Sequence, residues 1–144
     1  MKSLMSTLTP VIFGLVLTTA ASRLSAQITN PIRAHVDHSF MIGDKTLPPG
    51  DYTFRIEGNS DLGVMTVQNK NGDNVAQFSV RQSIDNRRPK HSELVFKRYG
   101  NVEFLSKVYE GGSKNGVSVS ETSKEEMHMM KEGQRAIEHT EEQP

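Results

Sequence analysis

Apolar and polar residues alternate along most of the chain between residues 32 and 120. Alternation with a period of two places successive side chains on opposite faces of an extended chain and is typical of half-buried β-strands. The clearest example follows Gly50, where Tyr52, Phe54 and Ile56 alternate with polar residues. The pattern predicts strands at about 32–42, 51–57, 63–69, 74–82, 93–99, 102–110 and 117–120.

Turn-forming residues separate the predicted strands. Pro48 and Pro49 lie between two glycines, and Asn71-Gly72 is typical of a tight hairpin because both residues accept a positive φ. Evenly spaced strands joined mostly by short turns predict an antiparallel all-β fold. We expect a small sandwich or a barrel-like meander of six to seven strands, plus a short C-terminal helix. The alternation does not choose between sandwich and barrel.

The composition changes near residue 121. Residues 121–144 contain seven acidic and three basic residues, whereas residues 27–120 contain ten acidic and twelve basic ones. Ser123 followed by Glu126 matches a helix capping box, so we expect a helix at about 124–132 with a frayed end after it. The chain thus divides into a β-domain at 27–120 and a charged tail at 121–144, helical or disordered.

The first 26 residues have the pattern of a secretory signal peptide. Lys2 precedes an apolar run at 11–17, and Leu24-Ser25-Ala26 matches a cleavage site. The apolar run is shorter than the ~20 residues that a membrane-spanning helix needs. We therefore expect an exported protein, periplasmic or secreted, with no transmembrane segment after cleavage.

Composition narrows the possible chemistry. The chain has no cysteine, which excludes disulfides, thiol nucleophiles and cysteine metal ligands. Residues 27–144 carry 15 basic and 17 acidic residues, and this balance gives no general attraction to nucleic acid. No cofactor is expected.

His35 and Asp37 are weak candidates for metal ligands, because they share one face of the predicted first strand. His38 points to the opposite face, and His91 is only a remote further candidate. Zinc requires three or four converging ligands, so we predict no metal site. The simpler expectation is that His35 and Asp37 face solvent and that His38 fills a core-side position.

A local concentration of basic and aromatic residues is the candidate ligand-binding surface. It can attract phosphates, acidic glycans, an acidic partner or the acidic tail of the chain itself. The alternative is a charged loop that protects strand edges from pairing with other chains. The candidate residues are Arg87, Arg88, Lys90, His91, Arg98, Tyr99 and Tyr109.

Two segments are similar to a known family. The first, at 40–53, contains G-D-K-x-L-P-x-G-x-Y, and the second, at 94–100, reads L-V-F-K-R-Y-G. With these segments, residues 34 to about 130 resemble an uncharacterised family of short exported bacterial β-proteins. The chain departs from that family at Asp37-His38, where a proline and an apolar residue are expected. The resemblance implies a small β fold and an envelope or secreted location, and it supplies no catalytic residues.

These observations predict an exported, non-enzymatic β-domain that acts as a binding or interaction module of the cell envelope or extracellular space. The sequence does not identify the ligand or the partner, for which an envelope protein and an acidic glycan are the candidates. The alternative is a structural or adhesion-type protein that associates through strand edges. An enzyme ranks third, because the sequence has no Gly-x-Ser-x-Gly elbow or other catalytic motif.

Overall fold

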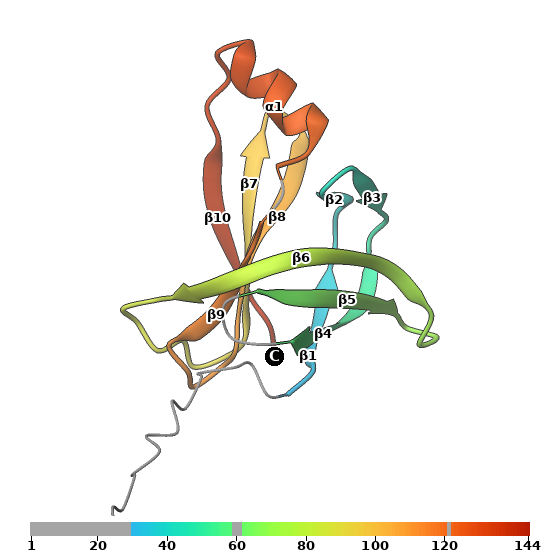
Figure 1. The fold of residues 1–144 in the computed structure, drawn as a ribbon, viewed down its shortest axis with the longest axis vertical. Helices are drawn as coiled ribbons and strands as arrows, with labels where there is room; N and C mark the ends of the chain where they lie inside the picture. Colours follow the sequence, from blue (N-terminus) through green and yellow to red (C-terminus); the bar gives the residue numbers. More distant parts are fainter. Residues whose placement is uncertain (1–29, 59–61, 121) are drawn as a thin grey trace, which may run out of the picture.

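The computed structural model describes residues 30–58, 62–120 and 122–144, so the expected signal peptide at 1–26 lies outside the described residues. The all-β fold with one short helix near the C-terminus is confirmed, with more strands than the six or seven expected (Figure 1). The described elements are β1 (Ile32–Val36), β2 (Phe40–Ile42), β3 (Lys45–Leu47), β4 (Gly50–Gly58), β5 (Gly63–Asn69), β6 (Asn74–Ile84), β7 (Glu93–Tyr99), β8 (Val102–Tyr109), β9 (Asn115–Val119), α1 (Lys124–Lys131) and β10 (Ile137–Glu142).

The strands form one sheet that curls back on itself. Its path runs β1-β4-β5-β6-β9-β8-β2-β3, so it begins and ends in the same N-terminal segment. Neighbours are antiparallel except β2 and β8, which pair in parallel where Met41 meets Phe104. Outside this path, β7 pairs with β8 and β10 pairs with β7. Figure 1 shows β6 running across the group formed by β7, β8 and β10.

The predicted first strand at 32–42 is interrupted. Residues 37–39 leave the extended ladder, so β1 pairs with β4 and β2 pairs with β3 and β8. The turn expected from Gly43 to Gly50 likewise contains the short strand β3. The interruption allows one chain segment to reach both ends of the sheet. The apolar alternation continues across it, so the sequence pattern predicted one strand where the structure has two.

One apolar core lies inside the curled sheet. It includes residues from both ends of the strand path, and a smaller cluster of Met41, Tyr99 and Phe104 lies beside it. Burial of large apolar side chains is the main force that holds such a sheet together. The largest fully buried side chains are Phe40, Phe54, Phe96, Met65 and Leu94.

The β5–β6 hairpin forms as expected, with a longer turn than Asn71-Gly72 indicates. The side-chain oxygen of Asn69 accepts hydrogen bonds from the backbone N–H groups of Asn71 and Asp73, at 3.0 and 2.9 Å. Only Gly72 takes a positive φ, of 87°. The turn is therefore held by the Asn69 side chain and does not need two residues in the left-handed region.

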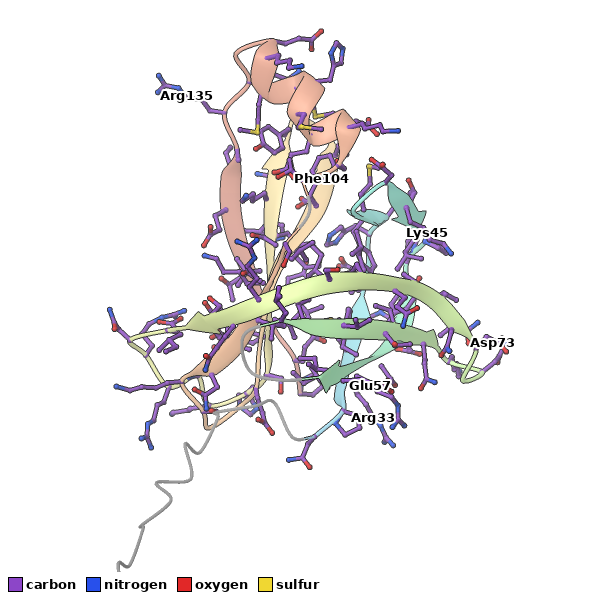
Figure 2. All side chains as sticks on the ribbon, in the orientation of Figure 1. Arg33, Lys45, Glu57, Asp73, Phe104 and Arg135 are labelled. Atoms are coloured by element: carbon purple, nitrogen blue, oxygen red, sulfur yellow. The ribbon has the colours of Figure 1, made fainter. Side chains whose placement is uncertain are left out.

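Helix α1 forms where the capping box predicts it. The Ser123 hydroxyl accepts a hydrogen bond from the Glu126 N–H at 2.9 Å. The helix packs through Met129 on the small cluster, and Phe104 lies directly below it in Figure 2. Tyr99 donates to the Glu126 carboxylate at 3.2 Å, and burial, with the nearby carboxylate, raises the Tyr99 pKa. Within the described residues, no helix is both long and apolar enough to cross a membrane.

The frayed end expected after the helix is wrong. Residues 137–142 form β10, which pairs antiparallel with β7 from Ile137 opposite Arg98 to Glu142 opposite Glu93. The exposed residues 132–136, which include Arg135, connect the helix to this strand (Figure 2). The polar composition of the segment concealed a strand, because it lacks the apolar alternation by which a half-buried strand is recognised.

Gly116 provides a stability test of the contact between β8 and β9. A Cβ at this position would lie 2.6 Å from the Val108 carbonyl oxygen and against the Tyr109 ring. We expect Gly116→Ala to lower the free energy of unfolding by about 1–3 kcal/mol, the usual cost of overpacking, in urea denaturation. Gly50→Ala is the control, since the nearest neighbours of a Cβ at this position are Tyr52 side-chain atoms at 3.8 Å or more. Equal stabilities for both variants would contradict the close approach.

Candidate metal centre

Three side chains from distant parts of the sequence converge beside β7. They are His38 from the break between β1 and β2, Glu103 from β8 and His139 from β10. Each contributes one potential ligand atom, and these atoms lie within 4.8 Å of one another. His38 Nε2, Glu103 Oε2 and His139 Nδ1 are buried and have no hydrogen-bond partner within the described part of the chain. Such groups are rare in folded proteins, and each requires a physical explanation.

The outer nitrogen of His38 faces carboxylates. Its Nδ1 lies 3.0 Å from Asp37 Oδ1 and 3.4 Å from Glu141 Oε1. A carboxylate only accepts, so this hydrogen bond places the proton on Nδ1 and leaves a lone pair on Nε2. The same hydrogen bond is the main cause that lowers the pKa of Asp37.

His139 is held in a similar way. Its Nε2 lies 3.4 Å from Glu141 Oε1, and its Nδ1 lies 3.5 Å from Glu103 Oε2. In the tautomer with the proton on Nε2, the lone pair of Nδ1 is directed towards Glu103. The His139 ring stacks on Phe96 with a centroid distance of 5.5 Å, and the His38 ring meets the same phenyl edge-on at 5.1 Å. Phe96 therefore fixes the planes of both imidazoles.

Glu103 supplies the negative charge. Its Oε1 lies 3.9 Å from Arg98 Nε, while its Oε2 lies 3.5 Å from His139 Nδ1. The side chains of Glu103, His38 and His139 are 11%, 26% and 32% exposed, so the centre is close to the surface but largely shielded from it. A cavity of about 250 Å³, lined in part by Phe40, Met41 and Glu103, adjoins it.

In this arrangement three hydrogen-bond acceptor atoms converge on one position. A single proton bridges two atoms at a time and would leave the third acceptor unpaired. A divalent cation can bond to all three at once and offset the buried charge of Glu103. Imidazole nitrogens that bind metals usually donate their other N–H to a carboxylate, which is the role that Asp37 and Glu141 have here.

The two metal candidates from the sequence are not brought together. His35 is exposed, and its Nδ1 lies 2.7 Å from Asp51 Oδ1. Asp37 instead contacts His38, the residue expected to point to the opposite face. His38 does take the core side of its segment, as expected, but its neighbours there include polar side chains.

The candidate ligand-binding surface divides between the two ends of the β7–β8 hairpin. Arg87 bonds to Asp85 at 2.9 Å and to Glu93 at 3.4 Å, near exposed Arg88, Lys90 and His91. Tyr109 is buried at the same end, with its hydroxyl 3.0 Å from Ser83 Oγ. Arg98 and Tyr99 lie at the other end of β7. The rise per residue of a strand puts the two ends roughly 20 Å apart.

His139 and Glu103 could hardly be identified as site residues from the sequence. The usable signal was the alternation of His139, Glu141 and Gln143, which puts three polar side chains on one face of an extended segment. This pattern carries no hydrophobic signal, and the segment follows a predicted helix. Glu103 lies within a predicted strand but 65 residues from His38.

No family model, curated protein or solved structure matches this chain.

The proton positions of the two histidines can be measured directly. In metal-free protein, at a pH where both rings are neutral, we expect the Nδ1–H tautomer for His38 and the Nε2–H tautomer for His139. Long-range ¹H–¹⁵N correlation spectra distinguish the tautomers, and exposed His91 gives the reference pattern. A proton on His38 Nε2 would contradict the inward lone pair.

Proposed function

We propose that this protein is an exported, non-enzymatic binding module whose ligand is a divalent transition-metal ion such as zinc, held by His38, Glu103 and His139. The observation that carries the proposal is the set of three buried acceptor atoms, one from each residue, without hydrogen-bond partners among the described residues. Each acceptor has a lone pair available, and together they need a cation.

The donor types favour a borderline-soft ion. Zinc is bound in proteins by imidazole nitrogen and carboxylate oxygen, whereas calcium and magnesium take oxygen ligands almost throughout. Two of the three donors are nitrogens, from His38 and His139. Because the chain has no cysteine, the site also lacks the thiolates that would favour copper(I).

The spacing of the donors is close to that of a bound ion. Ligands about 2.0–2.1 Å from zinc at tetrahedral angles lie ~3.3 Å from each other. His139 Nδ1 and Glu103 Oε2 are 3.5 Å apart, so this edge of the site needs almost no movement. Glu141, which contacts both histidines, is positioned to hold their rings during binding.

A binding role agrees with how the ligands are supported. Their supports, Phe96, Arg98, Asp37 and Glu141, are all side chains that orient the ligands. Such a second layer raises metal affinity and fixes geometry. The proposed location outside the cytoplasm rests on the signal-peptide pattern of residues 1–26.

Zinc titration against a chromophoric chelator tests the proposal. We expect one zinc ion per chain, with affinity lowered more than ~100-fold by His139→Ala and by Glu103→Gln, since each removes one of three ligands. Glu141→Gln keeps the ligands but removes the shared carboxylate, so we expect a loss of about 10–100-fold.

His91→Ala and His35→Ala are the matched controls, because both remove an exposed histidine outside the centre. They should bind zinc as the parent protein does. Calcium and magnesium should fail to compete at equal concentration. The proposal fails if the parent protein does not bind zinc, or if His35→Ala weakens binding as strongly as His139→Ala does.

A further inference from the structure

The inward face of β10 is polar. Its alternating inward positions, extended by one residue, are His139, Glu141 and Gln143, and all other residues of the strand are exposed. The two apolar clusters of the described residues contain no member of β10. Burial of apolar surface, which holds the other strands, therefore contributes little to the docking of this strand.

The contacts that do hold β10 are hydrogen bonds, the Lys107–Glu138 ion pair and the stacking of the His139 ring on Phe96. The strand pairs with β7, and at its end the Gln143 N–H donates to the Ser92 carbonyl at 2.8 Å. The Gln143 side-chain oxygen accepts from the His35 N–H, also at 2.8 Å. A typical hydrogen bond contributes only about 1 kcal/mol net, because water replaces it when the strand is released.

We propose that the metal locks β10 onto β7, and that without metal the strand opens and uncovers the hydrogen-bonding edge of β7. This inference rests on the proposed function, since His139 reaches the centre only when β10 is docked. Opening of the strand removes one of three ligands, whereas His38 and Glu103 stay with the remainder of the sheet.

The coupling follows from thermodynamic linkage. A ligand that binds only the docked state stabilises it by a factor of 1 + [L]/Kd, where [L] is the free metal concentration. At 100 times the dissociation constant, the opening equilibrium of β10 should therefore fall about 100-fold. The same linkage requires docking of the strand to raise metal affinity by an equal factor.

The exposed connection at 132–136 suits such an opening. Gly133 has a φ of 80°, and all five residues are exposed, so they can change conformation without disturbing the core. Helix α1 keeps its own contacts with Tyr99 and Lys97 through Glu126. The strand can therefore move while the helix stays docked.

Hydrogen exchange measured by mass spectrometry on the full-length protein, with and without zinc, tests the inference. Native mass spectrometry of the same samples reports whether zinc is bound. With free zinc at 100 times its dissociation constant, we expect the paired amides of β10 to exchange about 100-fold more slowly. Amides of the turn at 69–73, far from the centre in the chain topology, should not change.

Glu103→Gln is the main variant, because it removes a ligand on β8 and leaves the β10 peptide unchanged. It should abolish the zinc effect. Thr140→Ala, on the outward face of β10, is the control and should retain it.

The possible results separate the two proposals. Slower exchange of β10 only in zinc-binding variants supports the lock. Zinc bound without a change in β10 exchange overturns the lock and leaves the proposed function standing. If zinc does not bind the parent protein, both proposals fall.

Discussion

The constraint on which the structure depends is that one short segment closes the sheet at both ends. β1 pairs with β4 at the start of the strand path, and β2 pairs with β8 near its finish. A straight strand cannot follow both partners, so the chain breaks at residues 37–39. The break leaves the His38 side chain largely shielded and places its ring against Phe96, on which the ring of His139 also packs. Closure of the sheet therefore positions His38 for the centre, and the pairing of β10 with β7 adds His139.

The centre also explains why a polar strand docks on this sheet at all. A buried acceptor without a partner costs about 1–3 kcal/mol, so three of them would oppose the docking of β10. A cation that bonds to all three atoms would remove this free-energy cost of docking. The inward face of β10 thus supplies one ligand, His139, and the carboxylate of Glu141 that contacts both histidines.

The sequence was informative wherever apolar alternation decided the structure. Strands β4 to β8 lie close to their predicted ranges, and Ser123 caps the helix as expected, because their signals are local. The break at 37–39 and strand β10 could not be predicted this way. The first depends on pairing with β8, more than sixty residues later, and the second has polar residues where a core-facing strand has apolar ones. The centre could not be predicted for the same two reasons, because His38 lies in the break and His139 lies in the polar strand.

The acidic tail at 121–144 packs on the β-domain through a few ion pairs. It does meet basic residues of the β-domain, but at Lys107 and Lys97, which approach Glu138 and Glu126 at 3.4 and 3.6 Å. Glu126 is buried on the helix, whereas the Lys107–Glu138 pair on β10 is partly exposed. Exposed pairs contribute little stability, a median of about 0–1 kcal/mol, so this pair orients β10 without fixing it. Strong fixation would keep β10 docked whether or not the centre held an ion. With one weak ion pair and a polar inward face, β10 has few other contacts to hold it, so a cation bound to His139 would have a large effect on its docking.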